Sequence, residues 1–357
     1  MPNPSSKNYI VTASSADVEE LYCQFLSGDT GKLAGASAFA TAKTLVHQDR
    51  FASVKGGAPG CKSEASMYLV VGATGLVGRA VAQQLRKQAC EVRALLRGGV
   101  AHAEARSLAL AGVDIVAGDL RDPLAVAEAC TGVDTIICTA TSMPAAGGDA
   151  LQRVDQDGVL GLIAAAERAG VRRFVYTSFS ANIRVDSPLT SAKRSCEARL
   201  AASPIQSVIL QPSFFMEVWL GPYLGFDASR AHARIYGDGK AGVSYVSALD
   251  VAAFAVSAAT APGELRDVIH IGGPEPVAQL DVVAVFERTS GRSFSREHVP
   301  LQALEMQHLS ADPLQKSLAA LMMAYALGDP VAMARQTADR YGVQLTTVEE
   351  YAARLRP

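Results

Sequence analysis

Three glycines at fixed spacing are the first residues of this chain that could do chemistry. Gly72, Gly75 and Gly78 follow a hydrophobic run in "MYLVVGATGLVGRAVAQQL" (residues 67–85), and a helical pattern begins directly after them. Glycine permits a tight turn out of a strand and lets the backbone approach a phosphate closely, while the amide groups and dipole of the next helix attract anions. The arrangement predicts a site for the pyrophosphate of a dinucleotide.

The end of the next apolar segment indicates which dinucleotide binds. A site for NAD usually ends its second strand with Asp or Glu, which binds the ribose hydroxyls, whereas arginine suits the 2′-phosphate of NADP. In "EVRALLRGG" (residues 91–99) the tip carries Arg97 and no acid. The sequence therefore favours NADP(H), with Arg97 on the 2′-phosphate. The alternative is that Arg97 is a solvated loop residue.

Further cofactor contacts are expected where other strands end, because ligands bind at the carboxyl ends of parallel strands. Asp119 could accept a hydrogen bond from the adenine amino group, or it could cap the following helix, for which Asp122 is the better candidate. The expected cofactor-binding residues are Gly72, Thr74, Gly75, Leu76, Val77, Gly78, Arg97, Asp119, Leu120, Thr139, Ala140, Thr177, Lys193, Pro212, Ser213 and Phe214.

A parallel sheet is needed to bring these residues to one edge. Apolar runs alternate with amphipathic helical patterns from residue 67 onward, which is the signature of βαβ units. The pattern predicts a doubly wound α/β (Rossmann) fold. Its six expected strands are residues 68–73, 91–97, 113–119, 134–141, 172–179 and 207–213, and its expected helices are residues 76–87, 101–111, 123–130, 150–169 and 191–202.

The two ends of the chain differ from this central pattern. Residues 214–357 carry a glycine-rich turn, a short strand and several helical stretches, which we interpret as a small substrate-side lobe built on the Rossmann domain (residues 67–357). Residues 1–66 predict a helical extension and linker, with one helix over 16–26 and another over 33–46. We expect this N-terminal extension to pack on the main domain or on a second subunit, as in a homodimer.

The composition of the chain argues against nucleic acid, membranes and metal ions as binding partners. The chain has 357 residues and a formal net charge of -2, which gives no sign of a nucleic-acid or membrane partner. Its six cysteines lie far apart without ligand spacing, so no metal site is expected and most thiols should be reduced. Residues 318–327 form the most apolar later run, half the ~20 residues that span a bilayer. With no secretory leader at the start, we expect a cytoplasmic protein.

Several motifs in order carry a family resemblance. "VVGATGLVGRAV", "VAGDLRDP", "RRFVYTSFSA", "TSAKRSCEARL", "ILQPSFFMEVW" and "YGDGKAGVSYVSALDVA" together resemble an atypical short-chain dehydrogenase/reductase. Within that superfamily the chain is most similar to the NmrA-like proteins, which include isoflavone-reductase-like and divinyl-reductase-like enzymes. The resemblance covers residues 67–351 and implies an NAD(P)-binding Rossmann fold.

The resemblance also implies a role for one lysine. Typical members use a Tyr-xxx-Lys pair, in which the tyrosine is the general acid or base and the lysine binds the nicotinamide ribose. In "PLTSAK" Lys193 matches the lysine, but Leu189 stands in place of the tyrosine. Some NmrA-like reductases are thought to rely on the lysine, and others bind NADP as sensors. Lys193 is therefore expected to contact the cofactor. Whether it also donates a proton to the substrate or serves only as a cofactor contact is left open by the sequence.

A reductase is the function that these features favour. Ser178 could orient a substrate carbonyl, because a hydroxyl both donates and accepts hydrogen bonds. An apolar substrate wall is expected from Phe215, Met216, Trp219 and Tyr223. We predict an NADPH-dependent enzyme that transfers a hydride to a carbonyl or activated double bond of a hydrophobic small molecule, with Lys193 and Ser178 as catalytic residues. The alternatives are a redox-sensing regulatory protein that binds NADP(H), and an epimerase or dehydratase.

Overall fold

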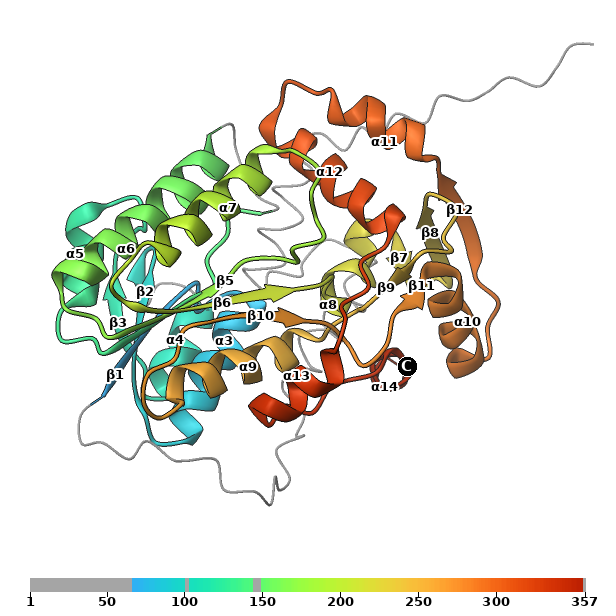
Figure 1. Ribbon diagram of the computed structural model, residues 1–357. Helices are drawn as coiled ribbons and strands as arrows, with labels where there is room; N and C mark the ends of the chain where they lie inside the picture. The colour runs from blue at the N-terminus through green and yellow to red at the C-terminus, as the bar shows by residue number, and fades with distance from the viewer. Residues whose placement is uncertain (1–65, 100–102, 144–148, 356–357) are drawn as a thin grey trace, which may run out of the picture.

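A seven-stranded parallel sheet forms the centre of the molecule (Figure 1). The computed structural model describes residues 66–99, 103–143 and 149–355, so the predicted N-terminal extension lies outside the described residues except for Ser66. The strand order is β10-β6-β5-β4-β1-β2-β3. The strands are β1 (Met67–Val71), β2 (Glu91–Leu96), β3 (Asp114–Ala117), β4 (Thr135–Cys138), β5 (Arg173–Thr177), β6 (Gln206–Pro212) and β10 (Asp267–Ile271).

The prediction of six strands was one strand short. The first six lie where the apolar runs predicted them, and β10 adds to the outer side of β6 in parallel register. Only Ile269 and Ile271 of its five residues are buried, and Val268 is 46% exposed. An edge strand of this kind lacks the continuous apolar run that marks a central parallel strand.

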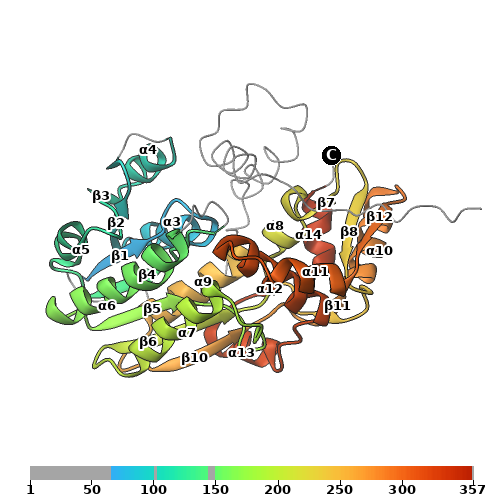
Figure 2. The same cartoon turned by 90° about the horizontal axis from the view of Figure 1, so that it is seen from above.

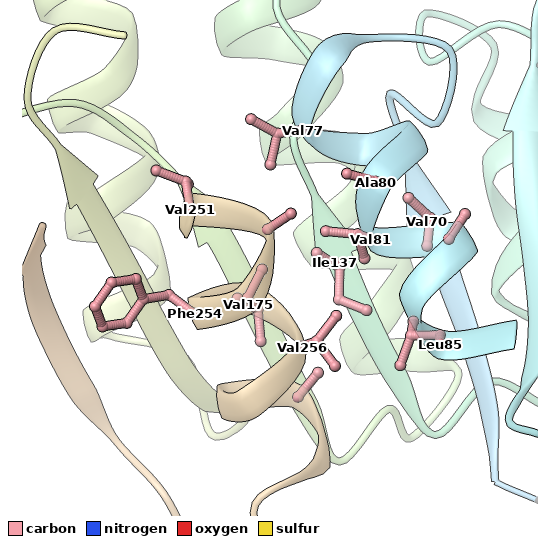
Figure 3. Close-up of a cluster of buried hydrophobic side chains, with 14 of the residues drawn as sticks. Val70, Val77, Ala80, Val81, Leu85, Ile137, Val175, Val251, Phe254 and Val256 are labelled. Atoms are coloured by element: carbon pink, nitrogen blue, oxygen red, sulfur yellow. The ribbon is translucent and has the colours of Figure 1, made fainter. Parts of the chain in front are cut away.

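Helices cover both faces of the sheet, which confirms the doubly wound α/β fold class (Figure 1). Figure 3 shows helix α3 (residues 76–87), with Val77, Val81 and Leu85, side by side with helix α9 (residues 248–260), with Val251 and Val256, on one face of the buried strands. One face carries α3 (Leu76–Lys87), α4 (Ala103–Leu110), α9 (Ala248–Thr260) and α13 (Ala334–Tyr341). The other carries α5 (Pro123–Cys130), α6 (Val159–Arg168) and α7 (Pro188–Ala201), with the π-helical turn η2 (Leu151–Gly158) leading into α6.

The remaining elements form a second, mixed half with its own apolar core (Figure 2). Strand β8 (His232–Tyr236) pairs with β7 (Phe226–Asp227) and β12 (Ser295–Val299), and β9 (Gly242–Val243) pairs with β11 (Val277–Ala278). Helix α12 (Pro313–Leu327) lies between α7 and this half. The other elements are α8 (Met216–Trp219), η3 (Pro222–Leu224), α10 (Gln279–Ser290), α11 (Leu301–His308) and α14 (Val348–Arg354).

The chain crosses between the two halves more than once. Helix α9, strand β10 and helix α13 all come after residue 214 in sequence, yet they pack on the central sheet. Among the described residues, none of the helices is both long and apolar enough to cross a membrane.

Candidate dinucleotide site

The glycine turn after β1 is too crowded for side chains at two of its positions. Gly72 has φ of +90°, and a Cβ there would lie 2.7 Å from Oγ1 of Thr139. A Cβ on Gly78 would lie 2.2 Å from the carbonyl oxygen of Gly72. Gly75 begins α3 without a side-chain cap, so amide groups of the first turn stay available to an anion. The turn therefore has the geometry that the sequence predicted for a pyrophosphate site.

The turn lies where the strand order reverses. Strand β1 pairs with β2 on one side and with β4 on the other, and Thr139 continues from β4 with its N–H donating to Val71 O at 2.9 Å. Thr139 and Ala140 are both half-buried beside Gly72. Ligands of open α/β sheets bind at this topological switch point. The predicted contacts from the first and fourth strands thus come together at one place.

The ends of β2 and β3 hold the residues expected at the adenosine end. Asp119 accepts from Nε and Nη2 of Arg121 at 2.9 and 2.8 Å, and these hydrogen bonds lower the pKa of Asp119 despite its partial burial. The exposed Arg97 lies close enough to add to that lowering. Asp122 caps α5 by accepting from Leu124 N at 2.9 Å, as predicted. Asp119 is therefore free of the capping role.

The remaining residues that were predicted to contact the cofactor at this end are buried or half-buried. Val77 is buried in the core between α3 and the sheet, while Thr74 and Leu76 are half-buried. Leu120 is half-buried and packs on the opposite core. Arg79, which the prediction omitted, follows on α3, and its Nε is buried without a hydrogen bond to a described residue.

Lys193 is buried at the end of β5. Ser187 caps α7 by accepting from Thr190 N at 3.1 Å, and Pro188 begins the helix, so Lys193 falls on its second turn. Its Nζ lies 3.5 Å from Thr177 O and 3.7 Å from Oδ1 of Asp155. Both distances exceed the ~2.7–2.9 Å of a strong charge-assisted hydrogen bond. The ammonium therefore has hydrogen-bonding capacity left over.

Leu189, where the wider superfamily has tyrosine, belongs to the core. It is 4% exposed and packs in a small cluster with Leu151 and Leu314. Its backbone N–H donates to Ser317 Oγ at 3.3 Å. An apolar side chain in this position supplies no proton, so any acid in the site must come from another residue.

Three hydroxyl groups near the strand ends are buried without partners. Oγ1 of Thr177, Oγ of Ser178 and Oγ of Ser213 make no hydrogen bond to any described residue. Buried polar groups are normally hydrogen-bonded, and such exceptions need a reason. A ribose and a carboxamide would supply the missing donors and acceptors. The hydroxyls of Thr177 and Ser213 and the ammonium of Lys193, which has few hydrogen bonds, fit the nicotinamide half of a dinucleotide, and the hydroxyl of Ser178 is left for a substrate.

Asp155 is a member of this site that the prediction missed. Its side chain is fully buried in η2, and it faces Lys193 on α7. A signal was present in the sequence, because Leu151, Asp155 and Leu162 share one face of the predicted helix over 150–169. An acid at a core position of an amphipathic helix indicates a buried charge with a partner.

The predicted substrate wall follows β6 but is unevenly exposed. Phe214 packs edge-to-face on Trp219 with ring centroids 4.7 Å apart, and Met216 is fully buried, so these side chains help to form the core of the mixed half. Phe215 and Tyr223 are half-buried. The backbone before them is fixed to the sheet, since Ser180 N donates to Pro212 O and Ser213 N donates to Ile271 O, each at 2.8 Å.

Comparison with known proteins identifies a family model and several relatives that match this chain. The model of the NmrA-like family matches residues 64–352. The chain is 32% identical over 270 residues to the NAD(P)H azoreductase of Xenophilus azovorans, covering 74% of this chain and 88% of that protein. It is 29% identical over 237 residues to the photosystem II assembly factor Ycf39 of a Synechocystis species, covering 66% of this chain and 71% of the relative.

A solved structure shares the fold. The NADPH-dependent quinone oxidoreductase of Escherichia coli, in complex with NADPH, superposes with a TM-score of 0.66 at 23% identity, covering 81% of this chain and 99% of the other. The two proteins therefore share a fold.

Proposed function

This chain belongs to the NmrA-like family, and we propose that it is an NADPH-dependent reductase of a hydrophobic small molecule with a carbonyl or activated double bond. The observation that carries the proposal is the buried ammonium of Lys193 beside orphaned hydroxyls at the strand ends. Its relative from Xenophilus azovorans, an NAD(P)H azoreductase, supports nicotinamide-dependent reduction.

The chain's own residues divide the work of binding. The glycine turn and the first turn of α3 would hold the pyrophosphate, and Arg97 would pair with the 2′-phosphate. Lys193 would bind the nicotinamide ribose, with Thr177 and Ser213 nearby as hydrogen-bonding groups. The preference for NADPH over NADH rests on Arg97, which forms no ion pair with a described residue.

Two side chains act on the substrate in this proposal. When bound, the dinucleotide supplies a hydride. Ser178 Oγ donates a hydrogen bond to the oxygen or nitrogen of the substrate's reducible group, which keeps the acceptor oriented. The ammonium of Lys193 gives a proton to the atom next to the one that is reduced, and the resulting amine takes a proton back from water. No hydroxyl is needed at position 189.

Phe215 and Tyr223 define the kind of substrate in the proposal. Both are half-buried beyond β6, so each has an apolar ring surface that a ligand could cover. Binding pockets for small molecules are mostly apolar with a few polar groups that fix orientation. A flat conjugated acceptor, such as a quinone, an azo compound or an enone, fits that combination.

The second candidate is a redox-sensing protein that binds NADP(H) without turnover. Two observations favour it: Leu189 replaces the usual acid, and one relative is a photosystem II assembly factor rather than a reductase in name. In this case the same residues would bind the dinucleotide, and a partner would read its redox state.

Steady-state oxidation of NADPH with a panel of quinones, azo compounds and enones tests the proposal. We expect turnover of at least one acceptor, and a loss of about tenfold to a hundredfold in kcat for Ser178→Ala with little change in the Kd of NADPH. Ser191→Ala, at an exposed position of α7, is the matched control. Binding of NADPH without oxidation by any acceptor would favour the sensor.

A further inference from the structure

A buried ion pair stands at the cofactor end of the sheet. The Nζ atom of Lys193 lies 3.7 Å from Oδ1 of Asp155, and the two side chains are 6% and 0% exposed. Removing one member of such a pair leaves an uncompensated buried charge, which is strongly unfavourable. The position of the lysine side chain therefore depends on Asp155.

The carboxylate is fixed from its other side by Ser142. The N–H and the Oγ of Ser142 donate to Oδ2 of Asp155 at 2.9 and 2.5 Å. Oδ1 makes no hydrogen bond to a described residue and faces Lys193. Ser142 follows β4, close after Thr139 and Ala140 at the switch point. Asp155 thus connects the end of β4 with the lysine of α7.

The backbone at Asp155 reinforces this connection. Asp155 lies in the π-helical turn η2, and its carbonyl oxygen accepts from Sγ of Cys196 at 3.3 Å. Cys196 lies three residues after Lys193 on α7. Both the side chain and the backbone carbonyl of Asp155 in η2 therefore contact α7. Segments of π-helix are rare and are frequently found at functional sites.

The other titratable groups around the ammonium are neutral. The ring centroid of Tyr176 lies 5.2 Å from Nζ, and burial raises the pKa of this tyrosine well above its usual range. Burial also raises the pKa of Cys138 to about 12 and that of Cys196 to about 11. At neutral pH these three groups carry no charge, and Asp155 supplies the negative charge that faces the lysine.

We propose that Asp155 is the positioning residue of this site, whose carboxylate holds the Lys193 ammonium in place and aims it at the dinucleotide. The Leu189 side chain has no polar group that could contact the lysine, and in this chain the carboxylate of Asp155 is the partner that holds the ammonium. The effect of Asp155 on turnover rests on the proposed function, whereas its effect on dinucleotide binding does not.

Calorimetric titration with NADP⁺ tests the proposal on the wild type, Asp155→Asn, Lys193→Met and the double variant. Asparagine keeps the shape and still accepts from Ser142, but it has no charge. We expect the Kd to rise about tenfold or more in each single variant, and the double variant to bind about as weakly as Lys193→Met, because Asp155 acts through Lys193. Asp157→Asn makes the same charge change at an exposed position of η2 and should stay within about twofold of wild type.

An unchanged Kd in Asp155→Asn would overturn the proposal. The proposal would also be overturned if the fold-changes in Kd of the two single variants multiplied in the double variant, because the two residues would then act independently. Thermal melting reports whether each variant folds. If Asp155→Asn does not fold, Ser142→Ala replaces it. This variant keeps both charges and removes one donor to Oδ2, so the Kd should rise about threefold, in line with one lost hydrogen bond. No rise would again count against the proposal.

The double variant separates positioning from a purely structural role, because a structural defect caused by Asp155→Asn would add to the loss in Lys193→Met instead of being hidden by it. Because these measurements follow binding alone, a wild type that binds NADP⁺ and reduces nothing would refute the proposed reductase and leave the role of Asp155 testable.

Discussion

A side chain at Gly78 would collide with Gly72. The Cβ would lie 2.2 Å from the carbonyl oxygen of Gly72, a separation that no real Cβ contact shows. The neighbouring atom is backbone and is itself held in a turn by the hydrogen bond from Gly75 N to Gly72 O at 3.0 Å. Helix α3 can therefore begin this close to β1 only because position 78 has no side chain.

Gly78→Ala should displace α3 and lose the dinucleotide. We expect the Kd of NADPH to rise by at least about a hundredfold, or the protein to fail to fold, because the helix N-terminus no longer faces the phosphates. Gly161→Ala is the matched control: Gly161 lies in α6 with open space around its Cβ, so the change should leave binding intact and stabilise the helix by up to about 1 kcal/mol. Normal NADPH binding by Gly78→Ala would contradict this account.

Arg97→Ala should discriminate between the two nicotinamide dinucleotides. We expect the Kd of NADPH to rise about tenfold to a hundredfold while that of NADH hardly changes, because only NADPH has the 2′-phosphate that a guanidinium binds. Fluorescence titration of both dinucleotides measures this, with the exposed Arg335→Ala as the control. Equal losses for NADPH and NADH would show that Arg97 has another role.

Restoring the superfamily's tyrosine should not restore its chemistry. Leu189 is buried against Leu151 and Leu314, so a tyrosine there would overpack the cluster and cost about 1–3 kcal/mol of folding stability. We expect Leu189→Tyr to lower the melting temperature without raising any reductase rate. Leu189→Met, which nearly conserves volume, should change stability by less. A gain in rate from Leu189→Tyr would mean that the site still accommodates the usual general acid.

Asp250 should make the protein less stable as the pH rises. Burial raises its pKa from 3.8 to about 7, although it accepts hydrogen bonds from Thr346 N and Oγ1. Between about pH 4 and 7 the folded protein therefore holds a proton that the unfolded chain has released. The stabilising contribution is present below pH 4 and is lost as the pH rises through 7, at up to about 1.4 kcal/mol per pH unit.

Chemical unfolding from pH 5 to pH 8 measures this contribution as the difference between wild type and Asp250→Asn. The variant should be relatively more stable at pH 8 than at pH 5, because asparagine has no proton to lose. Asp281→Asn, at an exposed first-turn position of α10, should follow the wild type. The same pH dependence in wild type and Asp250→Asn would show that the carboxyl is solvated in the folded state.

The sequence predicted the elements whose signals are local. The glycine turn, the first six strands and the cap at Asp122 lie where they were expected, because turn chemistry, continuous apolar runs and capping residues act over a few neighbours. Strand β10 was missed, because its exposure alternates and its residues adopt the strand conformation by pairing with β6, which is a contact distant in sequence.

The candidate site was predictable only in part, for a similar reason. The family motif marks Lys193, but its partner Asp155 lies 38 positions earlier, and only the packing of α7 on η2 brings them together. The aromatic wall shows the opposite problem: "SFFMEVW" predicts an apolar cluster, but not that Met216 and Trp219 turn into the core while Phe215 stays half-exposed. Which face of a short segment is buried is decided by tertiary contacts.

In the proposed reductase, hydride transfer to the substrate is paired with proton donation from Lys193. Stopped-flow mixing of protein and stoichiometric NADPH with the best acceptor of the panel tests this step in wild type and in Lys193→Met, with protein and NADPH both at concentrations far above the Kd of either protein for NADPH. We expect oxidation of one equivalent of NADPH by the wild type, a slower reaction with NADPH deuterated at C4, and a loss of about a hundredfold or more in the rate of Lys193→Met. Oxidation no faster than in protein-free solution, or an equal rate in Lys193→Met, would contradict it.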